Sequence, residues 1–355
     1  MKRLYKYILS VILLSLTFTG CHNNELTDAS SKQEQVQLLV SVSGVKSKVN
    51  VAGNAFENKD RFKFFFNLDK PDNGPASEGI ADSSPKRTEY TYNSGKWTPL
   101  APIYWDNYQM VNRDFCAIVM FCDQANDYSL GNYNLENHQF SVEWNQANQD
   151  NYREAYFYNK SDLMMARVAT SERLIPVVFS HIMSRVTVAV TATTDTTNKG
   201  YFIPNDIKSM KVLINGVQAT GQLTYNTPSS TDPAIAVSGM GTSGNITMFC
   251  ATKPTYSVAK QTITATYYAI FPPQVYNTLS NPLLTLVVTD SENTEKQYYL
   301  TVDNNLTFQQ GKNLSINVTL TKNGVKIKED VSIESGDWYT TPITIDDDES
   351  TIGLK

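Results

Sequence analysis

Residues 186–191 read Val-Thr-Val-Ala-Val-Thr, so three valines alternate with smaller or polar side chains. This period of two places the valines on one side of an extended chain and the threonines on the other. Valine and threonine are β-branched, which favours strands over helices. The stretch therefore predicts a β-strand with one buried face, and it sets the expectation for the rest of the chain.

The same kind of pattern recurs on both sides of this stretch. Val36–Ser43 alternates apolar and polar side chains, and residues 62–68 do so with Phe62, Phe64, Phe66 and Leu68, although Phe65 breaks the pattern. Phe115–Cys122 is apolar on both faces, as expected of a central strand. Further strands are predicted at 177–179, 211–215, 262–271, 283–289, 297–302 and 314–320. Thr224–Gly244 is rich in Ser, Thr, Pro and Gly and is predicted to be a loop.

Short strands with turns about every ten residues are typical of β-sandwiches. A chain of 355 residues is long for one sandwich. We therefore predict an all-β protein with two sandwich domains, over residues 36–192 and 193–345, separated near the turn-rich Thr193–Asn205. Residues 346–355 are predicted to be an acidic tail, because Asp346–Glu349 lacks the glycine and the ligand spacing of a calcium loop.

The first twenty residues have the layout of a secretory signal, with a basic Met1–Lys6 followed by an apolar Tyr7–Thr19. The small pair Thr19-Gly20 directly before Cys21 resembles a bacterial lipobox. This resemblance implies cleavage before Cys21, acylation of its thiol and an anchor in the outer membrane. Polar residues 21–35 would then serve as a tether. The alternative is a plain signal peptide followed by an incidental cysteine.

Charge and hydropathy exclude several classes of protein. The chain carries 30 basic and 35 acidic residues, a net charge of −5. Three of the basic residues and none of the acidic ones lie in the first twenty, so the remainder carries −8. An acidic chain without a basic cluster is a poor candidate for binding nucleic acid. Beyond the N-terminus, no apolar run approaches the twenty residues of a membrane-spanning helix.

The sequence gives no positive sign of catalysis or of a metal site. It has three histidines and four cysteines, and it lacks a nucleophile elbow, a P-loop and a zinc-protease motif. Cys116 and Cys122, if they lie in one strand, stand roughly 20 Å apart, which is too far for a disulfide. Cys250 could pair with either, although free buried thiols are the simpler interpretation. We predict no enzyme, no cofactor and no metal, and we keep a sandwich hydrolase as a remote third class.

Several short stretches, taken in order, resemble the fimbrillin family of type V pilus subunits from Gram-negative anaerobes. These stretches are Gly95–Thr98, Pro102–Trp105, Asp114–Ala117, Asp162–Ala166, Val177–Val186, Tyr268–Pro272, Phe308–Lys312 and Ser332–Trp338. The resemblance implies a lipoprotein precursor with two transthyretin-like Greek-key β-sandwich domains, destined for a fimbria at the cell surface. It also implies other fimbrial subunits as partners.

The family resemblance implies a route of assembly. A trypsin-like protease removes the first strand, and a strand from a neighbouring subunit fills the groove that is left. Here the removable strand would be Val36–Ser43. The candidate cleavage residues after it are Lys46, Lys48, Lys59 and Arg61. The alternative interpretation of these side chains is that they are ordinary solvated charges in a loop.

The C-terminal region offers a candidate for the incoming strand. Tyr339, Thr341, Ile343 and Ile345 share one face of an alternating stretch. The competing interpretation is that this stretch is the last strand of the second domain. Deciding between the two requires knowledge of what the stretch pairs with.

A second class of function stays open, a surface lipoprotein that binds a carbohydrate or a protein and never polymerises. An exposed aromatic side chain that could contact a ligand would indicate this class. Trp144, in the polar Glu143-Trp144-Asn145, is the candidate, whereas Trp105 and Trp338 are expected to pack in the interior.

Overall fold

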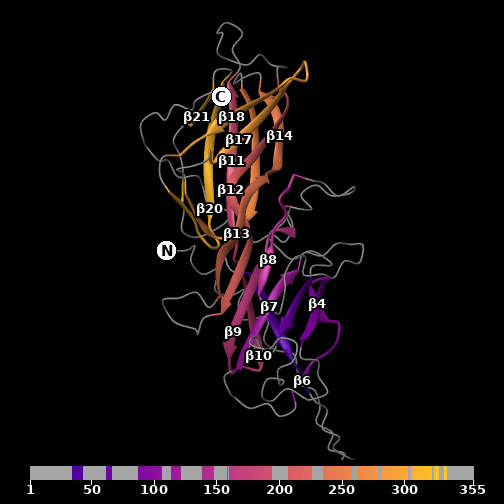
Figure 1. The fold of residues 1–355 in the computed structure, drawn as a ribbon. Helices are drawn as coiled ribbons and strands as arrows, with labels where there is room; N and C mark the ends of the chain where they lie inside the picture. The colour runs from indigo at the N-terminus through magenta and orange to yellow at the C-terminus, as the bar shows by residue number, and fades with distance from the viewer. Residues whose placement is uncertain are drawn as a thin grey trace, which may run out of the picture. The chain divides into compact units, whose positions relative to one another are not determined.

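The computed structural model describes much of the chain beyond residue 33. The described residues are 34–42, 61–65, 87–105, 113–120, 138–147, 158, 160–193, 207–225, 235–257, 262–277, 282–302, 305–321, 324–327 and 332–333. Those from Gln35 onward belong to one compact unit. Nearly all of them lie in β-strands (Figure 1), and the predicted all-β class is confirmed.

The earlier strands gather in one sheet, drawn in indigo to magenta in Figure 1. Among the described residues the order is β2-β10-β9-β7-β3-β4-β5. The bounds are β2 (Gln37–Val42), β3 (Arg61–Phe65), β4 (Arg87–Asn93), β5 (Lys96–Pro99), β7 (Arg113–Met120), β9 (Met164–Thr170) and β10 (Leu174–His181). The short strands β1 (Glu34–Gln35) and β6 (Tyr104–Trp105) belong to the same half. β7 lies between β9 and β3, so its predicted central position is confirmed.

The later strands form two larger sheets and a small pair. Their orders, for the described residues, are β14-β15-β11-β20-β21 with β22 also on β20, β13-β12-β17-β18 with β8 also on β12, and β16-β19. The bounds are β8 (Gln139–Ser141), β11 (Ser184–Thr193), β12 (Ile207–Tyr225), β13 (Ile235–Thr247), β14 (Phe249–Ser257), β15 (Thr262–Phe271), β16 (Gln274–Tyr276), β17 (Leu284–Asp290), β18 (Glu295–Leu300), β19 (Leu306–Phe308), β20 (Asn313–Thr321), β21 (Gly324–Ile327) and β22 (Ser332–Ile333).

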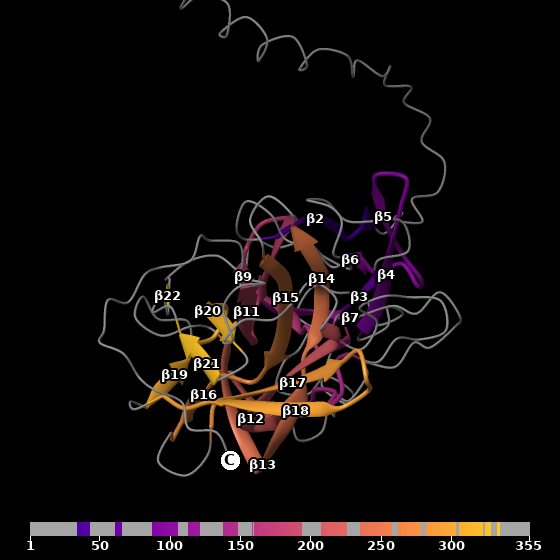
Figure 2. The same cartoon turned by 90° about the horizontal axis from the view of Figure 1, so that it is seen from above.

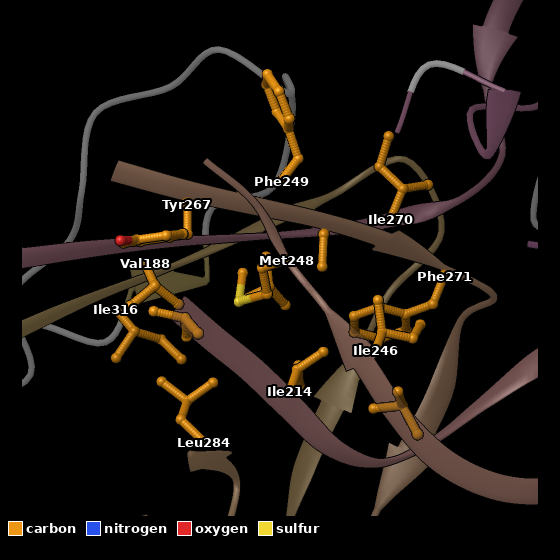
Figure 3. Packing of buried hydrophobic residues seen from close by; sticks show 14 of the residues in the cluster. Val188, Ile214, Ile246, Met248, Phe249, Tyr267, Ile270, Phe271, Leu284 and Ile316 are labelled. Carbon is orange, nitrogen blue, oxygen red and sulfur yellow. The ribbon is translucent and has the colours of Figure 1, made fainter. Parts of the chain in front are cut away.

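The two larger sheets face each other across one apolar core. Figure 2 shows β17 and β18 lying across from β14 and β15. In Figure 3, Ile214 and Leu284 from one sheet point toward Val188 and Ile316 from the other. All four side chains are at most 1% exposed. The alternating valines of residues 186–191 thus face the core of a sandwich, as their period of two predicts.

The first sheet is not flat, because β2 and β10 fold over its face. β10 pairs with β9 only at Ser180 and His181, and its residues 174–179 pair instead with β2. The rings of Phe179 in β10 and Phe62 in β3 lie 5.2 Å apart. In a flat sheet these strands, three places apart, would be separated by about 14 Å. The β2–β10 ribbon therefore covers the buried face of the other strands.

The predicted loop over Thr224–Gly244 is wrong for residues 224–225, which end β12, and for residues 235–244, which belong to β13. β13 forms a long antiparallel ladder with β12. Tyr225 pairs with Ile235 at one end of the ladder, and Leu213 pairs with Thr247 at the other. The glycines and Asn245 of β13 are poor strand formers when taken alone. The ladder with β12 overrides this weak local preference, because pairing with a neighbour satisfies the backbone of the whole segment.

A segment from the earlier half of the chain is built into the later sandwich. β8 pairs with residues 220–222 of β12, and Asn145 bridges to Thr247. The side chain of Gln146 is fully buried and acts like a peptide group, donating to the Ile270 carbonyl (2.6 Å) and accepting from the Ile270 N–H (3.0 Å). β11 pairs with β15 and β20. The boundary expected near residue 193 stays a prediction.

We predict that Gln146→Ala destabilises the protein by about 2–4 kcal/mol, because it leaves a buried N–H and a buried C=O of Ile270 without partners. Urea unfolding monitored by circular dichroism measures this free energy. Gln297→Ala, at an exposed glutamine of β18, is the matched control and should change it by less than about 0.5 kcal/mol. Equal effects of the two variants would refute the role assigned to the buried amide.

Candidate functional site

β2 alternates between the protein interior and solvent. Val36, just before the strand, is 2% exposed, and Leu38 and Val40 pack partly buried against the same core. Leu39, between them, is 59% exposed. The predicted half-buried strand with one apolar face is therefore confirmed for the residues that the structure describes.

The backbone of β2 is held by one ladder. It runs parallel to β10, in a register that pairs Gln37 with Leu174 and Val42 with Phe179. Ahead of the ladder, the Val36 N–H donates to the Ile103 carbonyl at 2.8 Å. Among the described strands, only β10 pairs with β2. Removing the chain up to the end of β2 would therefore break this pairing and the short pairing of β1 with β6, and it would leave the ladders among the other strands of the sheet intact.

The apolar core beneath the ribbon depends on this cover. Ile175, Val177 and Phe179 of β10 are fully buried, and Phe62 stacks on Tyr90 with ring centroids 5.0 Å apart. Burial raises the pKa of the Tyr90 phenol above its ordinary value, which marks a site with little access to water. Without β2, the apolar side chains that it covers would face solvent along a groove of strand length.

The opposite edge of this sheet looks different. β5 is only four residues long and carries Lys96, which is exposed, and Pro99. A short edge strand with a charge and a proline is poorly suited to accept another strand. β2 has neither a charge nor a proline in its six residues. Of the two edges, the one occupied by β2 is thus the one compatible with exchange.

The long edge of β13 in the later sandwich is closed by other parts of the chain. The Gln310 side chain donates to the Ile235 carbonyl (2.8 Å) and accepts from the Val237 N–H (3.0 Å). Two residues further, the Gly239 N–H donates to the Pro273 carbonyl at 2.7 Å. These bonds occupy backbone groups that an added strand would need.

The sequence profile of the fimbrillin-like family matches residues 47–349. The chain belongs to the fimbrillin-like family. The resemblance noted in the sequence is thereby confirmed.

Several crystal structures are similar to this fimbrillin-like chain. They include candidate cell adhesion proteins from Bacteroides uniformis ATCC 8492 (19% identity, 86% of this chain and 99% of that chain, TM-score 0.48) and Bacteroides ovatus ATCC 8483 (15% identity, 87% and 99%, TM-score 0.47). A fimbrial protein from Bacteroides ovatus ATCC 8483 matches at 17% identity over 86% of this chain and 54% of that chain, with a TM-score of 0.37. Among curated proteins, none matches the chain.

Of the predicted cleavage residues in the fimbrillin-like chain, Arg61 is the one that the structure describes. It is the first residue of β3, paired with Thr91 on one side and Met120 on the other. Its guanidinium donates to the Glu89 carboxylate at 3.1 Å. Two groups of predicted residues lie outside the described ranges, namely Cys21 with Lys46, Lys48 and Lys59, and the candidate strand residues Tyr339, Thr341, Ile343 and Ile345.

The described tryptophans include buried and exposed side chains. Trp105 is 3% exposed and belongs to the core beneath the ribbon, so its predicted interior position is confirmed. Trp97 packs partly buried against the same core. Trp144 is 43% exposed, consistent with its choice as the exposed aromatic. Trp338 lies beyond the described part of the chain.

The remaining candidate residues take structural positions. Cys250 is a free thiol whose pKa is raised by burial. Cys116 lies in β7, and Cys122 falls outside the description. His181, at the end of β10, lies 3.0 Å from Asp162. Within the described ranges no group of three or more His, Cys, Asp or Glu side chains is arranged to hold a metal, and no helix has the length and apolarity to cross a membrane.

Sequence reasoning missed the glutamines that stand in for strand partners. Besides Gln146 and Gln310, Gln274 accepts from the Gln218 N–H (2.7 Å) and donates to the Gln218 carbonyl (3.1 Å), where the β12–β13 ladder shifts register. A glutamine carries both a donor and an acceptor, so it can complete a ladder at such a point. No local signal distinguishes it from an ordinary polar residue.

We predict that Leu38→Asp weakens the docking of β2, because the new carboxylate would face the apolar core beneath the ribbon. Hydrogen exchange of the β2 amides should become at least about tenfold faster. Leu39→Asp is the matched control, since its side chain points to solvent, and it should change the exchange rate less than about twofold. The site would be wrongly described if the two variants behaved alike.

Proposed function

We propose that this chain is a structural or adhesive subunit of a cell-surface fimbria. In this proposal it is exported as a lipoprotein and assembles by strand exchange after β2 is removed. Membership of the fimbrillin-like family supports the surface location and other fimbrial subunits as partners. The single observation that carries the exchange step is that β2 completes an apolar core while pairing, among the described strands, with β10 alone.

The maturation cut is proposed to fall between β2 and β3. A protease of the trypsin type binds its substrate as an extended, accessible segment. Arg61 has its backbone paired on both sides and its side chain engaged by Glu89, which disfavours cleavage there. Lys46, Lys48 and Lys59 precede β3 and are the better candidates. Cleavage at any of them would separate β2 from the rest of the sheet without breaking β3.

The incoming strand is proposed to be the C-terminal stretch that contains Tyr339, Thr341, Ile343 and Ile345. β2 directs Val36, Leu38 and Val40 into the core at every second position. The C-terminal stretch has the same period of two. Main-chain bonds to β10 would give affinity, and the pockets left by the departed side chains would set the register.

A second function, binding without polymerisation, is favoured by the exposure of Trp144. An enzymatic function has no support from the family. The fimbrial proposal and the binding proposal differ in what they require of β2, which is lost in the first and retained in the second. The state of the N-terminus in the mature protein therefore separates them.

We predict that the protein recovered from the cell surface begins between residues 47 and 62. N-terminal sequencing measures this directly. A start at Cys21 in polymerised material would show that β2 is kept and would refute the exchange mechanism. The same start in strictly monomeric material would favour the tethered binding protein.

The triple variant Lys46→Gln, Lys48→Gln, Lys59→Gln should accumulate as uncut precursor, because the side chains that a trypsin-like protease requires are absent. Lys96→Gln, at an exposed lysine of β5, is the control and should mature normally. Normal maturation of the triple variant would move the cut to Arg61 or elsewhere.

Deleting residues 340–355 should block polymerisation and leave the monomer folded, because the incoming strand is lost while the groove remains. Polymer ladders on a non-dissociating gel and the thermal unfolding of the monomer are the two measurements. Unchanged ladders would refute the donor role. An unfolded monomer would instead assign the stretch to the second domain as its last strand.

A further inference from the structure

Trp144 exposes a large aromatic surface to water, and this exposure contributes nothing to the stability of the fold. Its side chain is 43% exposed, whereas Trp105 is 3% exposed. Burying the exposed part of such a side chain would favour the folded state. Trp144 lies just after β8, in the segment that fastens the earlier half of the chain to β13.

The backbone around Trp144 is fixed on both sides. The Trp144 carbonyl accepts from the Thr247 N–H at 2.8 Å, and the Gln146 N–H donates to the Thr247 carbonyl at 3.0 Å. On the other side, the Glu143 N–H donates to the Ser161 hydroxyl at 3.2 Å. An aromatic side chain on such a base is ordered before any ligand arrives, which lowers the entropy lost on binding.

A glycine provides the seat for the indole ring. A Cβ atom at Gly244 would lie 2.8 Å from the Cη2 and Cζ3 atoms of Trp144, closer than such atoms approach. The six-membered ring of Trp144 therefore lies against the bare backbone of β13. Part of the indole surface contacts Gly244. The exposed 43% of the side chain is surface that Gly244 does not cover.

The described residues of the two segments that meet at the indole are mostly polar, and the carboxylate of Glu143 is paired. Asn145, Thr242 and Ser243 are exposed neighbours in the two segments that meet here. Glu143 and Lys160 form an ion pair at 3.3 Å. The other large apolar side chains exposed in the described residues are Leu39, Leu100, Leu174, Val178, Tyr256 and Val275, none of which belongs to these two segments.

This pattern discriminates between kinds of ligand. An anchor for a protein partner is normally surrounded by further apolar contacts that exclude water. An isolated aromatic among hydroxyl, amide and paired charged groups suits a ligand with an apolar face and a polar rim. A pyranose ring has such a face, because its C–H bonds point toward the electron-rich ring while its hydroxyls point outward.

We propose that Trp144, seated on Gly244, is the stacking platform of a binding site for neutral oligosaccharides. The sugar face would stack on the exposed indole, and the hydroxyls would bond with side chains of the segments around Asn145 and Thr242. Because Glu143 and Lys160 neutralise each other, the described residues of these two segments carry no surplus acidic or basic charge to select an acidic sugar. The site is independent of strand exchange and operates in either function proposed above.

The test is binding of the purified protein to an array carrying neutral oligosaccharides and their sialylated counterparts. Fluorescence titration with the soluble form of the best neutral oligosaccharide then gives the affinity. The wild type should bind neutral oligosaccharides, and Trp144→Ala should lose at least about tenfold in affinity. Trp144→Tyr should retain most of the binding, because it keeps an aromatic face. Tyr256→Ala, at an exposed aromatic of β14, is the matched control and should bind as the wild type does.

Gly244→Val tests the seat, since its side chain would displace the indole and weaken binding while Trp144 is retained. Thermal unfolding of each variant checks that the fold persists. The proposal is overturned if no neutral oligosaccharide binds, if only sialylated ones do, or if Trp144→Ala binds like the wild type. Failure of these tests leaves the polymerisation experiments unaffected, so the two proposals are separately decided.

Discussion

The ladder between β2 and residues 174–179 of β10 is the constraint on which the earlier half of the molecule depends. It is parallel, it stands at the end of the sheet, and it carries both strands across the face of β3 and its neighbours. The apolar side chains of β2 complete the core, yet its backbone is secured along one side by the described strands. A strand in this position is needed for burial but is not tied into the sheet by a second neighbour. In the proposed assembly, loss and replacement of this strand would link subunits.

The later sandwich is built on the opposite principle. β12 is 19 residues long, and three other strands pair with it. β17 pairs with its residues 207–214 and β8 with its residues 220–222, whereas β13 pairs with residues 213–225. Where ladders end or shift register, glutamine amides and irregular segments take up the backbone groups, as at Gln146 and Gln310. These contacts hold the backbone of β12, β13 and β15 where their ladders end or shift. The two halves thus differ in how the backbone of β2 and that of β13 are held, by one parallel ladder in the first case and by a ladder with added side-chain and loop contacts in the second.

Strands with strict alternation could be predicted from the sequence because the period of two follows from backbone geometry alone. Val36–Val40 and Val186–Val190 are examples, and their buried faces lie where the period places them. β13 could not be predicted, because its glycines weaken the strand pattern and the ladder with β12 decides its conformation. The fold-over of the β2–β10 ribbon depends on contacts such as Phe62 with Phe179, which are distant in sequence. The protease and donor residues rest on family resemblance, because a loop lysine or a terminal strand has no local sign of its role.

The position of β2 also limits what could replace it. The candidate C-terminal stretch contains Pro342, which has no N–H to donate to a ladder. In a central strand such as β7, paired on both sides, a proline would leave a neighbouring carbonyl without its partner. In the place of β2, alternate residues direct their backbone groups away from β10, so a proline at one of these positions breaks no bond to it. Pro342 lies between Thr341 and Ile343, on the opposite face from the side chains that would enter the core. A strand with this proline is thus unsuited to the interior of a sheet, and an edge with one partner accepts it only where the proline nitrogen faces away from that partner.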